Sequence, residues 1–362
     1  MLTDNLSWEI ERVISREYAI IEEELLKKIV ADFWKGKDLT PEDWKIMKLS
    51  QLASYESNWK ATLAKLEKKA YREIESEIEN ALRQSAHYDD FVIGKVLGDV
   101  ADSTTSNAFK IRLDLAIKHA KESLNLTGTR AIFTAKDRFM AEVNSAYIRV
   151  LNGGTTLDEA MRSSVRSLAG DGMTVQYTTS TGKTINYSLD ASIRRDIITS
   201  VNQTASEYSL DLAGEYGTDL VQVSAHFGAR PSHAVWQGKV FSISGKTKGY
   251  ALLSAATGYG TAGGLCGVNC RHTFFPYFAG FSKEIDDSEI PGLRENREQY
   301  ENQQKQRAYE REIRRLKREI DAASITSDSR KSMLAGRLSS VRSEYILFLK
   351  DKGLTRFAER ER

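Results

Sequence analysis

The sequence contains only two cysteines and four prolines among 362 residues. Two cysteines four positions apart can close only one small, strained loop, so disulfides do not hold this fold together. No run of eighteen apolar residues occurs, and the first residues, MLTDNLSWEIERV, lack the basic and apolar segments of a secretion signal. We therefore expect a soluble chain made without a secretion signal, with no membrane among its partners.

An excess of charge of either sign is also missing. The chain has 52 basic and 50 acidic residues, a net charge of +2, so no global field favours nucleic acid or a membrane surface. If nucleic acid or a membrane surface is bound, a locally charged region of the chain must bind it. A hydrophobic content of 41% over this length excludes a disordered chain and is enough for two or three domains with a sizeable core.

The residues that can carry chemistry are concentrated between Ser224 and Phe278, which hold both cysteines and three of the five histidines. Zinc in proteins takes four ligands, chiefly cysteine thiolate and histidine imidazole. The candidate ligands are His233, Cys266, Cys270 and His272, with His226 as the alternate histidine. The spacing C-x-x-x-C-x-H lacks the paired C-x-x-C of zinc ribbons and fingers. Two other interpretations stay open: a loop-rich core fixed by buried cysteines and hydrogen-bonded histidines, and a catalytic site, for which no residue can be named.

Residues 1–152 predict a helical region. Apolar residues recur at spacings of three and four from Ile10 to Phe33, and Gly36 ends this first helix. Thr40-Pro41-Glu42-Asp43 has the residues of a helix start. The apolar pattern that follows predicts a helix of roughly forty residues, about 60 Å long. Further helices are expected near 107–124 and 130–151, and together they form either an antiparallel bundle or an arm that reaches neighbouring chains.

Asn152-Gly153-Gly154 ends the helical region, and residues 153–285 predict a small α+β domain. We expect a short helix at 157–169, a β-hairpin formed by 174–177 and 184–187, a helix at 190–215, and short strands at 220–223 and 239–242. Residues 286–362 predict charged helices at 294–323 and 327–351. The expected fold class is therefore α+β and mostly helical, with a long N-terminal helix and charged C-terminal helices.

The C-terminal region carries the strongest local charge. Seven basic and two acidic residues between Lys305 and Arg318 give a net charge of +5. On a helix, the arginines form one basic face suited to phosphates, so the candidate DNA-binding residues are Lys305, Arg307, Arg311, Arg314, Arg315 and Arg318. The alternative is a solvated helix whose charges are compensated by neighbours three or four positions away.

The stretches HFGARPSHAVWQGKV and GYGTAGGLCGVNCRH resemble the phage minor capsid protein 2 family, which is related to the Mu F type head morphogenesis proteins. LDEAMRSSVRSLAGDGMTVQYTTSTGKTINYSLDASIRRDIITSVNQTA and YENQQKQRAYEREIRRLKREI extend the likeness. The resemblance implies a structural protein of the phage head, assembled in the bacterial cytoplasm. It also implies few copies at or near the portal vertex, contact with portal or major capsid protein, and exit with the DNA.

The resemblance also marks site residues. Mu F type relatives carry a cysteine and histidine cluster where this chain has His233 and Cys270-Arg271-His272, which favours the zinc interpretation. Further positions that match the family pattern are Arg194, Arg195, Asn202, Gln203, Arg230, Trp236, Gln237 and Arg271. Arginine binds carboxylates, carbonyls or phosphates, so these residues form either one polar ligand site or, as we expect, a buried structural network.

Two function classes therefore compete. The first is a non-enzymatic virion protein with a zinc-stabilised α+β domain and a basic helix toward packaged DNA. The second is a metal-dependent hydrolase or transferase carried in the virion. A structural zinc site is closed by four protein ligands, whereas a catalytic site keeps a position for water in a cleft. We expect the structural protein.

Overall fold

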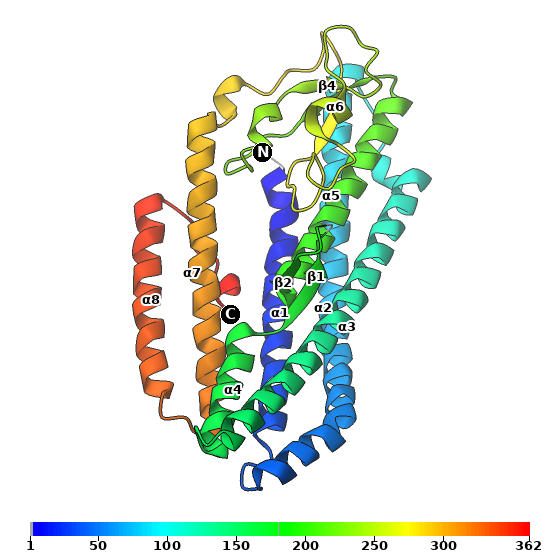
Figure 1. The fold of residues 1–362 in the computed structure, drawn as a ribbon. Helices are drawn as coiled ribbons and strands as arrows, with labels where there is room; N and C mark the ends of the chain where they lie inside the picture. The colour runs from blue at the N-terminus through cyan, green and yellow to red at the C-terminus, as the bar shows by residue number, and fades with distance from the viewer. Residues whose placement is uncertain (1–2, 180) are drawn as a thin grey trace. The chain divides into compact units, whose positions relative to one another are not determined.

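Long helices make up most of the chain in the computed structural model, which describes residues 3–179 and 181–362 (Figure 1). The helices are α1 Thr3–Trp34, α2 Pro41–Leu97, α3 Asn107–Leu151, α4 Leu157–Asp171, α5 Leu189–Glu215, α6 Leu253–Thr257, α7 Leu293–Thr326 and α8 Lys331–Lys352. The strands are β1 Thr174–Thr178, β2 Thr184–Ser188, β3 Leu220–Val223, β4 Val240–Ser242 and β5 Phe274–Tyr277. The mostly helical α+β class is thus confirmed, together with the hairpin and the two charged C-terminal helices.

Two helix predictions were wrong in length. α2 has 57 residues rather than about forty, since it runs without a break from Pro41 to Leu97 and includes Gly94. α3 is one helix of 45 residues where two were predicted. It runs through Gly128, at which a side-chain Cβ would lie 2.6 Å from Glu67 Oε1 and 3.0 Å from Leu63 Cδ2. The glycine thus serves close packing of α3 on α2 rather than helix termination.

Strand β5 was not predicted from the sequence pattern. Its four residues, FFPY, are all buried, so the alternation of apolar and polar residues that identifies a half-exposed strand is absent. Proline within a strand also argues against a central position, and β5 is indeed an edge strand of the order β4-β3-β5.

The chain forms two compact units, each built from three separate segments. The first unit comprises Met1–Val13, Arg72–Ser123 and Arg194–Lys305, and the second comprises Ile14–Tyr71, Leu124–Ile193 and Gln306–Arg362. Helices α1, α2 and α3 contribute residues to both units. The predicted three-part division at residues 152 and 285 stays a prediction.

The first unit contains the antiparallel sheet β4-β3-β5. β3 is central and pairs with β4 through Val221 opposite Phe241, and with β5 through Val223 opposite Phe274. β3 is buried along its whole length, and its Val221 and Val223 belong to the core cluster. The core cluster consists of Val221, Val223, Trp236, Phe241, Leu253, Leu265, Cys266, Cys270 and Phe274. Both cysteines are therefore core residues, and both are free thiols.

Helix α5 packs in the first unit through buried polar contacts. Ser209 Oγ donates to Asp89 Oδ2 of α2 at 2.6 Å, and Tyr208 Oη donates to the Ser103 carbonyl at 2.8 Å. Burial raises the pKa of Asp89 well above its usual range, since the serine hydroxyl compensates only part of the lost hydration.

The second unit is centred on aromatic residues. Phe139 of α3 packs edge-to-face on Phe33 of α1 and on Trp59 of α2, with ring centroids 5.3 and 5.4 Å apart. Lys48 is fully buried beside them, and its Nζ donates to the Lys35 carbonyl at the C-terminal end of α1. A donor at this end of a helix satisfies carbonyls that have no partner within the helix.

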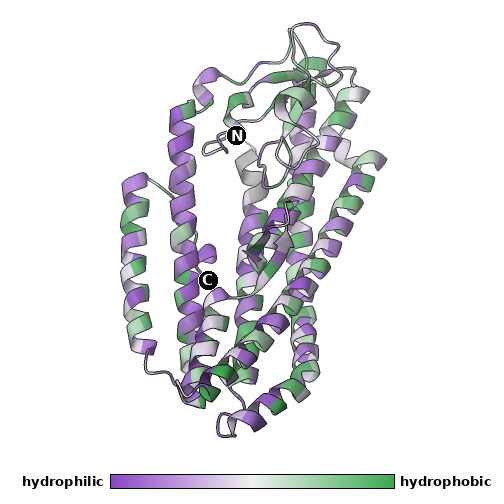
Figure 2. Cartoon of the chain, viewed as in Figure 1, coloured by the Kyte–Doolittle hydropathy of each residue, from purple (hydrophilic) through white to green (hydrophobic). Residues whose placement is uncertain are grey.

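Figure 2 shows that α7 is coloured mainly as hydrophilic. In the second unit, its few buried apolar residues meet those of α8, for example Ile313 with Tyr345 and Leu349. Gln306 Nε2 of α7 also donates to Tyr345 Oη at 3.2 Å. Of the helices in the described part of the chain, none combines the length and the apolar character needed to cross a membrane.

A partly buried carboxyl group links α2 to α1 in the second unit. Tyr18 Oη donates to Glu67 Oε1 at 3.2 Å, and Tyr18 is 1% exposed. Burial raises the pKa of Glu67 to about 7, although the tyrosine hydrogen bond acts in the opposite direction. A carboxyl group whose pKa is raised in the folded state stabilises the fold fully below its unfolded pKa, and this contribution is lost as the pH rises through the folded value.

We expect Glu67→Gln to remove this pH dependence. The amide keeps the acceptor oxygen for Tyr18 and carries no charge at any pH, so the variant should melt higher than the wild type at pH 8 and similarly at pH 4.5. Thermal melts between pH 4.5 and 8 measure the effect. Glu122→Gln, at an exposed position of α3, is the control and should follow the wild-type profile. A Glu67→Gln profile parallel to the wild type would contradict the assignment.

Candidate metal centre

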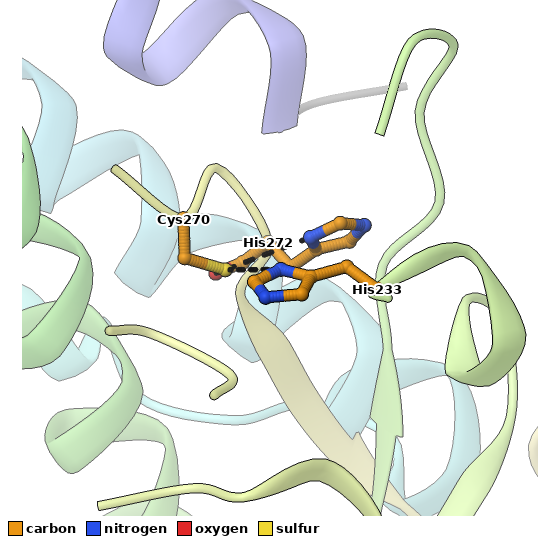
Figure 3. Close-up of side chains that lie close together, drawn as sticks. All are labelled: His233, Cys270 and His272. Carbon is orange, nitrogen blue, oxygen red and sulfur yellow. Dashed lines mark hydrogen bonds between the residues drawn. The ribbon is translucent and has the colours of Figure 1, made fainter. Parts of the chain in front are cut away.

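His233, Cys270 and His272 lie close together inside the first unit (Figure 3). Cys270 Sγ is 3.6 Å from His233 Nδ1 and 3.6 Å from His272 Nδ1, and the three atoms all lie within 4.8 Å of one another. All three residues are buried, with exposed fractions of 3% or less. Two imidazole nitrogens and one sulfur therefore face a common point that is closed to bulk water.

The far side of each imidazole ring has its own hydrogen-bond partner. His233 Nε2 lies 2.9 Å from the Gly263 carbonyl, which can only accept, so Nε2 carries the proton. His272 Nε2 lies 3.1 Å from Gln237 Oε1, and that same oxygen accepts the His226 backbone N–H at 2.7 Å. The backbone donor fixes Oε1 as the acceptor, so His272 Nε2 is also protonated. In the neutral rings, both Nδ1 lone pairs are then directed at Cys270 Sγ.

Burial keeps these groups neutral. Desolvation lowers the pKa of His233, lowers that of His272 well below its usual range, and raises the pKa of the Cys270 thiol. Trp236 contributes to this desolvation, because its ring centroid lies 4.7 Å from those of both His233 and His272. His226 stacks on His272 at a centroid distance of 4.2 Å.

The glycine-rich loop before Cys270 is wound tightly. A Cβ at Gly264 would lie 2.0 Å from the Gly258 carbonyl oxygen, so only glycine fits there. Cys266 and Asn269 adopt positive φ values of 57° and 56°, which non-glycine residues rarely do. This winding brings the Gly263 carbonyl onto His233 and returns the chain to Cys270.

Cys266 does not join the group, although its residue type and position made it a predicted ligand. Its Sγ lies 2.9 Å from Ser206 Oγ of α5 and 3.5 Å from the His272 carbonyl. Burial raises the pKa of this thiol far above its usual value. Cys266 thus packs the loop against α5, and the structure brings together three of the four named ligands.

The residues expected to form one polar network lie at separate places. Asn202 Nδ2 donates to the Cys270 carbonyl at 2.6 Å, and Arg230 Nη2 donates to the Val268 carbonyl at 3.1 Å, so both hold the cysteine loop. Gln237 and Trp236 contact the histidines, as described above. The guanidinium of Arg271 pairs with Glu11 of α1, a partner 260 positions away that no sequence pattern indicated.

The remaining members of that set lie on α5. Arg195 Nη2 pairs with Asp196 at 2.7 Å, and both line a groove together with Gln203 and His119. Arg194 is the neighbouring residue of the same helix. The set therefore divides between the cysteine loop and the surface of α5 rather than forming one ligand site.

The predicted basic face of α7 is largely engaged within the second unit. Arg315 pairs with Glu312 and Glu319 at 2.7 and 2.6 Å. Arg314 donates to the Arg360 carbonyl. Arg318 donates to the Ala169 and Gly170 carbonyls at the end of α4, at 3.0 and 2.8 Å. Lys305 and Arg311 are exposed, and Arg307 is half-buried.

Comparison with known proteins gives a family match over nearly the whole chain. The sequence model described as "Phage minor capsid protein 2" matches residues 2–343. A protein of Lactococcus phage LL-H named "Structural protein" is 28% identical over 189 residues, 50% of this chain and 49% of the relative. A "Structural protein" of Lactococcus phage mv4 is 40% identical over 70 residues, 18% of this chain and 52% of that relative. The chain thus spans about half the length of these curated relatives. No solved structure matches.

The contacts of Arg318 predict that this residue stabilises the second unit. Arg318→Gln removes two charge-assisted hydrogen bonds to the end of α4, and we expect it to cost about 2 kcal/mol of stability. Arg311→Gln on the same helix is the matched control, and as an exposed substitution it should change stability by less than about 0.5 kcal/mol. Calorimetric melting of both variants measures the difference, and equal melting temperatures would show that Arg318 has no such role.

Proposed function

The chain belongs to the phage minor capsid protein 2 family, and on that basis we propose that it is a low-copy structural component of the virion at or near the portal vertex. The observation that carries the proposal is the family match over residues 2–343. The names of the two Lactococcus phage relatives, both structural proteins, agree with it. Portal or major capsid protein is then the direct partner, and assembly takes place in the bacterial host cytoplasm.

A structural role fits the candidate centre better than the alternative of a metal-dependent hydrolase or transferase. A catalytic metal needs a position that substrate and water can reach. Three protein ligands leave a fourth position, so burial rather than the number of ligands supports the structural role: His233, Cys270 and His272 are buried, and Trp236 and His226 pack against the rings. A family that is defined by a capsid role rather than by a reaction also favours a non-enzymatic protein.

The proposal includes contact with packaged DNA through α7. The net charge of +5 between Lys305 and Arg318 supports this contact. Arg314, Arg315 and Arg318 are engaged within the chain, so the proposed contact with phosphates rests on the exposed residues Lys305 and Arg311. Contact with DNA in the head would allow the protein to leave with it.

Copy number and location test the virion role. We expect quantitative mass spectrometry of purified virions to find far fewer copies of this chain than of the major capsid protein, and labelled antibody to mark one vertex of opened heads. Comparison of full particles with particles that have ejected their DNA shows whether the protein leaves. Absence from purified virions, or a copy number equal to that of the major capsid protein, would refute the proposal.

The salt dependence of DNA binding tests the role of α7. Each phosphate contact contributes about 0.9 to the slope of log affinity against log salt on duplex DNA, so Lys305→Gln with Arg311→Gln should lower the slope by up to about 1.8. Gel-shift titrations over a salt series measure it. Arg315→Gln is the matched control, since Arg315 is held by Glu312 and Glu319 and should affect the slope less. Affinity that does not change with salt, or a double variant that behaves as the wild type, would remove DNA from the partners.

A further inference from the structure

We propose that Cys270 Sγ, His233 Nδ1 and His272 Nδ1 bind one zinc ion as three protein ligands, that a bound water molecule takes the fourth position, and that Cys266 is not a ligand. This inference stands on the geometry of the first unit and does not depend on the virion role. Thiolate with imidazole is a ligand set that suits zinc, whereas magnesium and calcium take oxygen ligands.

The distances fit a tetrahedral zinc ion. Bonds of about 2.3 Å to sulfur and about 2.0 Å to nitrogen, set at the tetrahedral angle, place a sulfur and a nitrogen ligand about 3.5 Å apart. Both distances from Cys270 Sγ to the histidine Nδ1 atoms are 3.6 Å. The sulfur atom and each nitrogen are thus already spaced as two ligands of one zinc ion.

Without a metal, hydrogen bonds cannot satisfy both Nδ1 atoms of His233 and His272. Both Nδ1 atoms are acceptors, because each Nε2 carries the ring proton toward Gly263 or Gln237. The Cys270 thiol has one proton and can serve only one of them. The other Nδ1 lone pair would face sulfur lone pairs in a site closed to bulk water, which costs free energy. A cation between the three atoms removes this conflict, and the thiol proton passes to solvent when the metal binds.

The outer partners are those of a metal site. Histidine ligands of zinc usually donate their second ring N–H to a carbonyl or carboxylate, which fixes the ring orientation. The Gly263 carbonyl and Gln237 Oε1 fill this role for His233 and His272. His233 directly precedes the short helical turn Ala234–Trp236, and His272 lies two residues before β5. The ion would thus join a turn after β3 to the start of β5.

The two cysteines provide a matched experiment. We expect the full-length protein purified without added chelator to contain about one zinc per chain by elemental analysis. Cys270→Ser should lose the metal and melt at a lower temperature, whereas Cys266→Ser should keep it. Metal-free wild type that takes up no added zinc and whose melting temperature zinc leaves unchanged would overturn the proposal. Loss of zinc in Cys266→Ser, with Cys270→Ser still loaded, would overturn the ligand assignment.

If the Cys270→Ser variant does not fold, a measurement on the wild type still tests the proposed site. Cobalt(II) exchanged into the site should show intense visible bands of four-coordinate cobalt and a sulfur-to-cobalt charge-transfer band. Weak visible bands without the charge-transfer band indicate octahedral oxygen ligands and would contradict a site with a thiolate.

The outer partner Gln237 gives a further test. Gln237→Leu removes the oxygen that accepts from His272 and should weaken zinc affinity about 10- to 100-fold, as loss of an outer partner does elsewhere. Gln237→Glu keeps an acceptor oxygen and should retain most of the affinity. Competition with a zinc indicator dye measures both. Equal affinities in the wild type and both variants would show that His272 is not oriented through Gln237 as a ligand.

Discussion

The arrangement around the candidate centre depends on how helix α5 holds the cysteine loop. Asn202 donates to the Cys270 carbonyl, and Ser206 contacts Cys266 one helical turn further along. These two buried contacts fix both ends of the segment Cys266–Cys270, in which Cys266 and Asn269 adopt positive φ values. Such conformations persist only where the surrounding structure over-determines them. The position of Cys270 Sγ between two imidazole rings is therefore a property of α5 as much as of the loop.

The sequence was sufficient where a pattern is local. Caps and apolar spacing located α1, the start of α2 and the helix α4, and the Gly-containing turn located the hairpin β1-β2. Prediction from the sequence failed where tertiary packing overrides the local conformational preference. Two helices were predicted on either side of Gly128, but this glycine lies inside α3 and permits its close approach to α2. β5 is buried on both faces and so has no alternating pattern.

In the candidate site, too, the local pattern predicted some features, and tertiary packing decided the others. Residue types and clustering were enough to select His233, Cys270 and His272, but spacing could not separate Cys266, which lies only four positions from Cys270. The partner of Cys266 is a serine on a helix 60 positions away. Similarly, counting charges located the basic part of α7 but could not show which arginines are engaged. Arg318 meets carbonyls of α4 that lie 148 or more positions away in the chain.

A metal ion would stabilise the first unit, whose sheet is small. Its sheet has strands of four, three and four residues, and so small a ladder contributes few backbone hydrogen bonds. The connections between strands are held instead by side chains. Asp219 accepts from Ser242 and Thr247, and Asn296 both donates to and accepts from the backbone of Ala229. Zinc bound by Cys270, His233 and His272 would add its binding free energy to the stability of the folded unit, because the ligands come together only in the folded chain. A metal bound by residues in the long connection between β3 and β5 would therefore stabilise that connection.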